Sequence, residues 1–237
     1  MDGAKLRLAA GCRASTDFVR DPRGFKPKEL KQVLKLRINA LPTRKRIGRG
    51  RRTDTSCRAC AVPAETLAHV IQSCPRTHEG RLLRHDFVVF RIHGALKEKA
   101  FETEKEHLYK LSEGSLKQDL VAVKGEGAGR KATILDVQVV SGTGVQVWHQ
   151  NKVLKYERRA DLATAIRSRK QAADVRTVAV TLTWRGLWFQ ESYQDLRNMG
   201  LSHGLLSGLA NSVARGSLWN WYAFNTRLDT YRRVGVG

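Results

Sequence analysis

The chain has 237 residues, of which 41% are hydrophobic, and its 43 lysines and arginines exceed its 22 aspartates and glutamates to give a formal charge of +21. This length favours one main domain with an appendage over two full domains, and the charge favours a polyanionic partner, with nucleic acid ahead of an anionic membrane surface. The sequence lacks an apolar run of about 20 residues, a lipid-binding amphipathic helix and a secretory signal, so we expect no membrane partner and a reducing nuclear or cytoplasmic setting.

The amino-terminal part begins with a segment of mixed composition, residues 1–25, which we expect to be a poorly ordered lead-in or the broken end of a longer parent chain. Apolar residues then recur at helical spacing, which predicts a helix that begins at Pro27 and ends near Ala40. These apolar residues are Leu30, Val33, Leu34 and Ile38.

A basic segment, RKRIGRGRR, comes next, with two glycines and nothing to bury. We interpret it as a flexible segment that binds phosphate groups or directs nuclear import, and a solvated linker without a specific role is the alternative. Its predicted nucleic-acid-binding residues are Arg44, Lys45, Arg46, Arg49, Arg51 and Arg52.

Three cysteines and a histidine follow in the pattern C-x2-C-x8-H-x4-C, formed by Cys57, Cys60, His69 and Cys74. The first two cysteines can bind one ion from a tight turn, and the other two ligands can project from one turn of a short helix. This pattern predicts a closed, structural zinc site that orients the basic segment on nucleic acid. Buried cysteines around a core histidine are the alternative, although so polar a segment needs metal binding to fold. Cys12 stands apart and is expected to be a free thiol.

The middle of the chain predicts a mixed sheet. Apolar residues at steps of three to five predict one amphipathic helix within residues 76–101. Strands at 119–124 and 132–140 flank a GEGAG turn and predict a β-hairpin. A helix at 151–171 and a strand at 175–184 then form a crossover unit, so we expect an α/β fold with a mixed β-sheet flanked by helices. The apolar residues of the first helix are Leu82, Leu83, Phe87, Val88, Ile92 and Leu96.

The last part of the chain, residues 190–233, is predicted to be helical. Its aromatic side chains are expected to complete the core. They are Trp219, Trp221, Tyr222 and Phe224.

Asp136 lies in the middle of an otherwise apolar strand, where burying an unpaired acid is costly. By the alternation of a strand, Asp136 and Gln138 share one face, and the hairpin can bring Asp119 toward it. Carboxylate oxygens in such a group suit magnesium, which completes its shell with water and substrate phosphate. The alternative is a structural salt bridge from Asp136 to a nearby base. Candidates for that base are Arg130, Lys131 and the lysines of the next helix.

Lys152, Lys155 and Tyr156 share one face of that helix by their spacing. A lysine beside a divalent cation can steer or deprotonate the attacking nucleophile and stabilise the charge of a pentacovalent phosphate. Two acids, a cation and a lysine therefore predict a site that cuts phosphodiesters.

The succession of these motifs resembles the carboxyl-terminal part of the polyproteins of site-specific non-LTR retrotransposons that insert into ribosomal RNA genes. It runs from LPTR through the CCHC knuckle, RTHEGRLLRHDFVV, an acid after Lys117 and ILDVQVV to NKVLKY, over roughly residues 30 to 185. In that family the reverse transcriptase, an RNA-directed DNA polymerase, lies upstream, and the polyprotein ends in the knuckle and a restriction-like endonuclease of the PD-(D/E)xK superfamily. The resemblance implies a linker, helix and basic segment at 1–52, a zinc knuckle at 53–78, an endonuclease core at 79–189 and a helical extension at 190–237.

The resemblance also implies roles for single residues. Asp119 and Asp136 match the two metal-binding aspartates, and Gln138 occupies the position that is Glu or Gln across the superfamily. The lysine expected two residues later is Val140 here, and the resemblance moves its function to the following helix, where Lys152 and Lys155 are the candidates.

The family's Arg-His-(Asn/Asp) signature matches Arg84, His85 and Asp86, which implies that Arg84 contacts nucleic acid and that His85 helps to position DNA or the site. A capping or core role is the alternative for His85. Where the family has Lys-Pro-Asp, this chain has Gln118, and we expect a looser loop with the chemistry intact, because proline would fix φ without binding metal. A decayed copy of the element is the alternative.

These features predict a metal-dependent endonuclease with catalytic magnesium and structural zinc. By resemblance, it nicks target DNA in ribosomal genes, and the freed 3′ hydroxyl primes reverse transcription of the element RNA by the upstream polymerase, in the nucleus. The alternative is a catalytically silent module that binds DNA or RNA through its basic segment and zinc knuckle, with structural acids in the strands.

Overall fold

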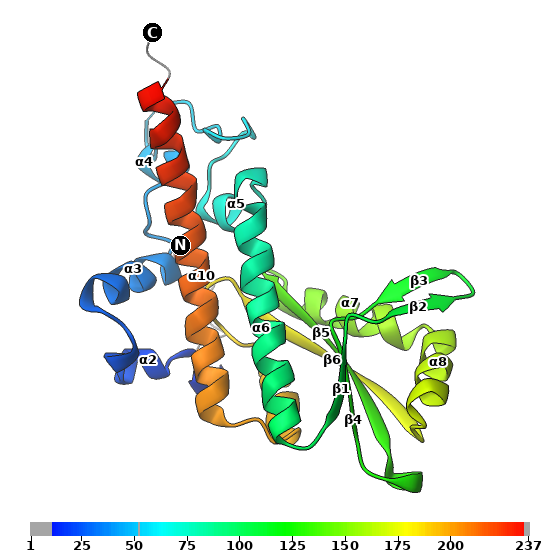
Figure 1. Ribbon diagram of the computed structural model, residues 1–237. Helices are drawn as coiled ribbons and strands as arrows, with labels where there is room; N and C mark the ends of the chain where they lie inside the picture. The colour runs from blue at the N-terminus through cyan, green and yellow to red at the C-terminus, as the bar shows by residue number, and fades with distance from the viewer. Residues whose placement is uncertain (1–10, 52, 235–237) are drawn as a thin grey trace.

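The computed structural model describes the backbone of residues 11–51 and 53–234, with side chains up to Thr226. Its centre is a four-stranded sheet in the order β1-β4-β5-β6 (Figure 1). β4 pairs antiparallel with β1 and β5, whereas β5 and β6 are parallel, so the predicted α/β fold with a mixed sheet is confirmed. The strands are β1 (Glu102–Lys105), β4 (Leu120–Lys124), β5 (Lys131–Val140) and β6 (Asp174–Thr183).

Helices cover both faces of this sheet (Figure 1). They are α6 (His78–Glu98) and α10 (His203–Val234) on one face, and α7 (Val145–Glu157) and α8 (Ala160–Lys170) on the other. Side chains of β5 alternate between the two faces, with Leu135 and Val137 packed in the cluster of α6 and α10, and Ile134 in that of α7 and α8. Because both faces are covered, β5 has the nearly continuous apolar run of a central strand.

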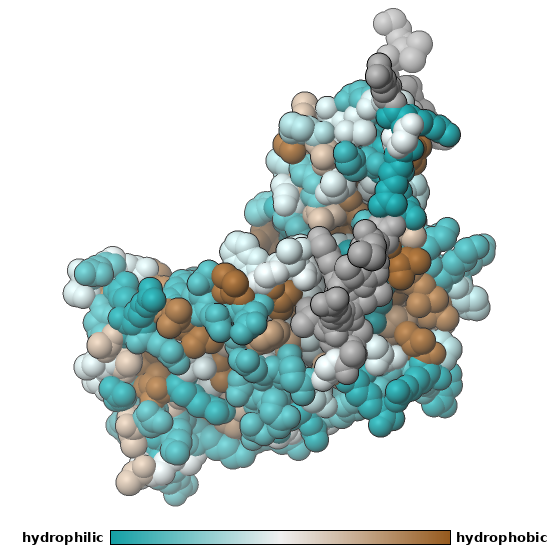
Figure 2. Space-filling view, turned by 180° about the vertical axis from the view of Figure 1, so that it is seen from behind, coloured by the Kyte–Doolittle hydropathy of each residue, from teal (hydrophilic) through white to brown (hydrophobic). Residues whose placement is uncertain are grey.

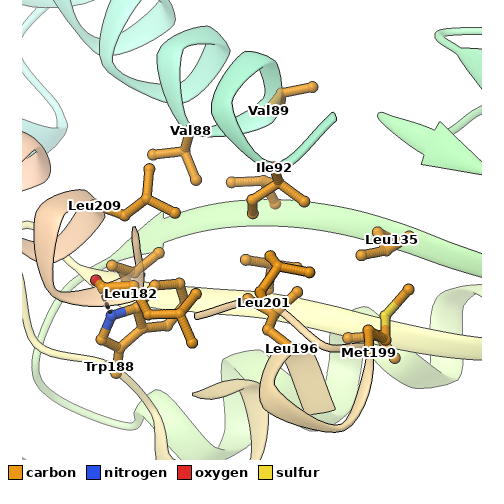
Figure 3. Close-up of a cluster of buried hydrophobic side chains, with 14 of the residues drawn as sticks. Val88, Val89, Ile92, Leu135, Leu182, Trp188, Leu196, Met199, Leu201 and Leu209 are labelled. Atoms are coloured by element: carbon orange, nitrogen blue, oxygen red, sulfur yellow. Dashed lines mark hydrogen bonds between the residues drawn. The ribbon is translucent and has the colours of Figure 1, made fainter. Parts of the chain in front are cut away.

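The cluster beneath α6 and α10 joins the sheet to the carboxyl-terminal part of the chain (Figure 3). The indole N–H of Trp188 donates to the carbonyl of Leu206 at 2.9 Å, which ties the loop after β6 to α10. The side chains labelled in Figure 3 are Val88, Val89, Ile92, Leu135, Leu182, Trp188, Leu196, Met199, Leu201 and Leu209. The predicted helical extension therefore shares its core with the strands.

The predicted long helix is confirmed as α6, but its predicted apolar face is partly wrong. Val88, Ile92 and Leu96 are fully buried. Leu83 is 64% exposed, and Leu82 and Phe87 are also exposed. Leu83 and Phe87 line an open groove between α6 and α10 rather than the core.

The single helix predicted at 151–171 is two helices, α7 and α8. The break falls at Arg159, whose guanidinium group turns onto the carboxylate of Asp161 at 2.9 Å. α7 also begins six residues earlier than predicted, at Val145, after Gly144 with φ of +67°. Both helices still form the crossover between β5 and β6.

The carboxyl-terminal part is helical as predicted, with α9 (Gln190–Asn198) and α10 separated by a turn at Gly200. Phe224 is fully buried in a cluster with Cys57, Val70 and Cys74. Trp221 packs against this cluster and against the neighbouring one that contains Trp184. Trp219 and Tyr222 are exposed, so their predicted core role is wrong.

The expectation of a poorly ordered lead-in is wrong for residues 11–25. Phe18 and Phe25 are buried in one cluster with α3 (Pro27–Arg37), which ends three residues before the expected Ala40. The short elements before α3 are η2 (Arg13–Ser15), α2 (Asp17–Arg20) and η3 (Pro22–Gly24). Residues 1–10 lie outside the described part of the chain.

Three strands were not predicted: β1 and the hairpin of β2 (Leu108–Leu111) and β3 (Gly114–Lys117). Their sequences are polar or mixed, without apolar alternation. The remaining elements are α4 (Arg44–Ile47), α5 (Leu67–Gln72), η4 (Pro75–Thr77) and η5 (Gly127–Gly129).

The surface seen in Figure 2 is largely hydrophilic, with hydrophobic side chains in small groups. Among the described residues, none of the helices combines the length and the hydropathy that a bilayer-spanning segment requires.

Candidate functional site

Two aspartates meet at one edge of the central hairpin. Leu120, the first residue of β4, pairs with Leu135 of β5, so Asp119 just before it lies opposite Asp136. The backbone N–H of Val137 donates to Asp119 Oδ2 at 2.6 Å, and the two carboxyl groups lie within hydrogen-bonding reach of each other. Asp136 is 4% exposed. The hairpin thus brings the two predicted acids together, with Asp136 buried and the Asp119 side chain 18% exposed.

The surroundings shift the pKa values of the two carboxyl groups in opposite directions. Burial, followed by the neighbouring Asp119 carboxyl, raises the pKa of Asp136 against the opposing effect of Lys152. Burial would also raise the pKa of Asp119, but hydrogen bonds, first among them the one from His85, lower it to about 2. Asp119 is therefore the more strongly ionised acid of the pair.

α7 brings a lysine and a tyrosine to Asp136. Lys152 Nζ lies 2.7 Å from Asp136 Oδ2, and the Tyr156 hydroxyl donates to the same oxygen at 2.5 Å. Lys155 Nζ lies 4.0 Å from that oxygen and donates to the Tyr156 hydroxyl at 3.0 Å. The two candidate lysines therefore converge on Asp136, with Lys152 closer. Arg130, an alternative partner for the acid, instead pairs with Glu102.

His85 of α6 completes the group from the other face of the sheet. Its Nε2 lies 3.2 Å from Asp119 Oδ2 and 3.2 Å from the Val137 carbonyl, and its Nδ1 lies 3.0 Å from Asp86 Oδ1. The hydrogen bond to Asp119 outweighs burial and raises the pKa of His85 to about 9. The protonated His85 side chain therefore holds the Asp119 carboxylate in place and does not have a core role.

Gln138 and Gln118, the neighbours of the two acids, make different contacts. The Gln138 amide donates to Thr181 Oγ1 at 2.9 Å and to the Trp148 carbonyl at 3.1 Å, so it links β5 to β6 and α7. Gln118 is 1% exposed, and neither polar atom of its amide has a hydrogen-bond partner among the described residues. The residue that replaces the family's proline is thus an unsatisfied buried amide.

The acid pair can accept a magnesium ion but does not form a complete cage for one. In the described ranges, no third Cys, His, Asp or Glu joins Asp119 and Asp136 in a multi-ligand group. Magnesium is commonly held by one or two carboxylates together with water and substrate phosphate, so two acids suffice. The raised pKa of Asp136 beside Asp119 fits a position that a cation would stabilise.

The predicted zinc ligands meet in one cluster. The ligand atoms of Cys57, Cys60, His69 and Cys74 all lie within 4.8 Å of one another. Cys57 Sγ and Cys74 Sγ are 3.9 Å apart, and Cys60 Sγ and His69 Nε2 are 3.3 Å apart. Tetrahedral zinc places such atoms about 3.4–3.8 Å apart, so the group fits a closed zinc site. Burial, aided by the neighbouring thiols, raises the pKa of Cys74 to about 12, and a cation would compensate that cost.

A buried glutamate that the sequence did not single out supports the zinc cluster. The Glu65 side chain is inaccessible, accepts two hydrogen bonds at 2.9 Å from the Arg58 guanidinium group, and accepts the backbone N–H groups of Arg58 and Arg44. It is the one acid between Asp54 and Glu79, and this isolation is the sequence feature that could have marked it.

The basic segment is more ordered than predicted. Arg44 donates to Asp54 at 2.9 Å, and Arg46 donates to the Asn39 carbonyl at 2.9 Å around the short helix α4. The exposed members of the segment are Lys45, Arg49 and Arg51, and Arg52 lies outside the described residues.

The structure also corrects the implied role of Arg84. Its guanidinium group is buried between helices, where it donates to Ser217 of α10 at 2.6 Å and to Gln72 of α5. Arg84 is therefore a link between α5, α6 and α10, and nucleic acid cannot reach it without unpacking them.

No protein family model matches the chain. It is 37% identical over 240 residues to the "Retrovirus-related Pol polyprotein from type-1 retrotransposable element R2" of Nasonia vitripennis, which covers 98% of this chain and 22% of that protein. It is 35% identical to the type-1 R2 polyprotein of Bradysia coprophila, over 95% of this chain and 26% of that protein. The type-2 element R2DM polyprotein of Drosophila melanogaster is also 35% identical, over 92% of this chain and 21% of that protein. The chain thus spans only 21% to 26% of these relatives' length.

Proposed function

The chain belongs to the family of the Pol polyproteins of R2 retrotransposable elements, whose carboxyl-terminal part it matches, and we propose that it is a magnesium-dependent DNA endonuclease within such a polyprotein. The convergence of Asp119, Asp136 and Lys152 at one edge of a mixed, helix-flanked sheet is the observation that carries this proposal. It is the arrangement expected of a PD-(D/E)xK-type nuclease whose lysine has moved to the following helix.

Asp119 and Asp136 would hold the magnesium ion. Bound magnesium supplies Lewis-acid stabilisation of the charge on the scissile phosphate. His85 and the Val137 N–H fix the Asp119 carboxylate, and the Tyr156 hydroxyl fixes that of Asp136, so both acids are oriented before substrate arrives.

Lys152 would orient the attacking water and stabilise the developing negative charge. Its ammonium group lies at Asp136, and the Lys152 side chain as a whole is 24% exposed, so solvent reaches part of it. Lys155, at 4.0 Å from the same oxygen and 46% exposed, would contact the DNA backbone beside it.

The wider setting follows from the family. The cut would free a 3′ hydroxyl that primes reverse transcription of element RNA by an upstream RNA-directed DNA polymerase domain. Ribosomal DNA in the nucleus would be the target, and the zinc knuckle with the exposed Lys45 and Arg51 would contact nucleic acid.

One observation favours a second function, a silent nucleic-acid-binding module. The 2.7 Å ion pair of Lys152 with Asp136 already compensates the buried acid, as a structural salt bridge would.

A supercoiled-plasmid nicking assay separates the two. We expect the wild-type chain to nick in magnesium and not in EDTA, and Asp119→Ala and Asp136→Ala to lose at least about 100-fold in rate with DNA binding retained. Asp174→Asn, which changes an exposed acid at the start of β6, is the matched control and should nick normally. Nicking by both alanine variants would refute the site, and tight binding without nicking by the wild type would support the silent module.

A further inference from the structure

An exposed tryptophan lies on the same helix face as the two candidate catalytic lysines. Trp148 of α7 is 54% exposed. Lys152 and Lys155 follow it by four and seven residues, the spacing that aligns side chains along one face of a helix. Trp148 therefore lies one turn before the lysine that contacts Asp136.

The position of Trp148 relative to the acids is fixed by contacts on both sides. Its carbonyl accepts the 3.1 Å hydrogen bond from Gln138, which lies two residues after Asp136 on β5. The indole Nε1 lies 3.9 Å from where a Cβ on Gly144 would stand, so the ring rests beside the loop that begins α7. The next residue, His149, is buried and bonded to Thr181 of β6. The Trp148 ring is exposed, but the backbone of Trp148 is anchored to β5, the strand that carries Asp136.

Single exposed hydrophobic residues are common on protein surfaces, so exposure alone carries no function. Here Trp148 shares its helix face with Lys152 and Lys155, which begin one turn further along α7. The rise between the Cα atoms of Trp148 and Lys152 is about 6 Å along the helix axis. That distance is close to two base steps of duplex DNA, each about 3.4 Å. Aromatic side chains in basic surroundings stack on the bases of single strands regardless of sequence, and an apolar side chain can wedge between the base steps of a duplex.

We propose that Trp148 stacks on a nucleobase one or two steps from the scissile phosphate and so positions the strand that is cut. This rests on the proposed endonuclease function. Lys155 would contact the DNA backbone, and Lys152 would act at the scissile phosphate, while the ring holds a base, which fixes the register of the strand at the acid pair. A protein partner on the same ring is the competing occupant, and the charge of its neighbours argues for DNA instead.

The test compares Trp148→Ala and Trp148→Phe with Trp219→Ala. Trp219 is a matched control because it is 53% exposed, but lies on α10 against Gly80 of α6. Nick sites mapped on plasmid define short duplexes, on which kcat/KM is measured with magnesium. We expect Trp148→Ala to lose about 5- to 150-fold, Trp148→Phe to keep most of the activity, and Trp219→Ala to match the wild type.

A second series uses the same duplexes with an abasic site at each of the two nucleotides on either side of the cut. At the stacked position the wild type should fall to the level of Trp148→Ala, and the alanine variant should not fall further. If Trp148→Ala cuts within twofold of the wild type, while Asp136→Ala is inactive, the endonuclease stands and the role of Trp148 is refuted.

Fluorescence gives a readout that does not need cutting. In EDTA, added duplex should quench the emission component that Trp148→Phe removes, and should leave the component that Trp219→Phe removes unchanged. Absence of the first quenching overturns the proposal whatever the nicking result. A wild type that binds DNA and never nicks refutes the endonuclease and, with it, a base contact at a scissile phosphate.

Discussion

Lys152 Nζ lies 2.7 Å from Asp136 Oδ2, so the acid in the middle of the central strand is charge-compensated without any ion. In a nuclease, this contact would place the lysine ready to act on the substrate. In a binding module, the same contact would be a structural salt bridge. Stability measurements can therefore separate the two functions where geometry alone does not.

Asp136→Asn should leave the melting temperature unchanged or raise it. The amide keeps an oxygen for Tyr156, removes a charge held beside Asp119, and leaves Lys152 able to turn to solvent. Thermal unfolding checks this, with Asp174→Asn as the control. A drop of more than about 4 °C, the equivalent of roughly 1–2 kcal/mol for a chain of this size, would indicate a structural acid.

Gln118→Met should stabilise the chain. The buried Gln118 amide lacks hydrogen-bond partners among the described residues, and an unpaired buried polar group costs about 1–3 kcal/mol. Methionine has a similar length without that cost, so we expect the melting temperature to rise by a few degrees. Gln194→Met, on the exposed side of α9, is the control. An equal or lower melting temperature for Gln118→Met would mean that the amide has a partner in solution.

Zinc removal should unfold the cluster of Cys57, Cys60, His69 and Cys74. Native mass spectrometry should find one zinc per chain, which Cys60→Ala loses and Cys12→Ala retains, because Cys12 lies apart in another cluster. A chelator should lower the melting temperature and expose this segment to protease. Equal metal content in both variants would rule out the site.

Glu104→Gln should destabilise the chain at neutral pH and not in acid. Glu104 joins β1 to α8 through Arg169 at 2.6 Å and Lys170 at 3.2 Å, and the hydrogen bond from Arg169 is the main cause that lowers its pKa from 4.5 to about 2. A carboxyl group with a lowered folded pKa stabilises the fold above its unfolded value and loses that contribution as pH falls toward the folded value.

The measurement is the melting temperature of Glu104→Gln and wild type between pH 7 and pH 3. We expect a gap of about 1–4 °C at pH 7, which narrows below pH 4.5. Glu98→Gln, at the exposed end of α6, should show no gap. A gap independent of pH would mean that the substitution acts through packing rather than charge.

The sequence was sufficient where neighbours along the chain make the contact. Asp119 and Asp136 come together because a short hairpin joins their strands, and the four zinc ligands lie within one segment. Local spacing also placed Lys152 on the face of α7 that meets the acid.

The sequence was insufficient where the partner lies far along the chain. Arg84 has the charge of a DNA contact, but Ser217, 133 residues later, and Gln72 take its guanidinium group. Leu83 fits the apolar pattern of α6, yet it lines an open groove between α6 and α10 and stays exposed. β1 has the sequence ETEK and is held by Arg130, Arg169 and Lys170 rather than by burial, so no hydrophobic pattern marks it.

α10 is one uninterrupted helix that packs both against the central sheet, which carries the acid pair, and against the zinc cluster. Leu209 packs in the cluster beneath α6 and α10, and Phe224 packs beside Cys57 and Cys74. The helix between those two residues is about 22 Å long, roughly six to seven base steps of a duplex. In the proposed nuclease, a duplex bound at the zinc knuckle would therefore meet the acid pair at a constant distance along this helix. One extra residue in this stretch would rotate the knuckle by about 100° around the helix axis relative to the acid pair. The position of the cut relative to the DNA bound at the knuckle would then change.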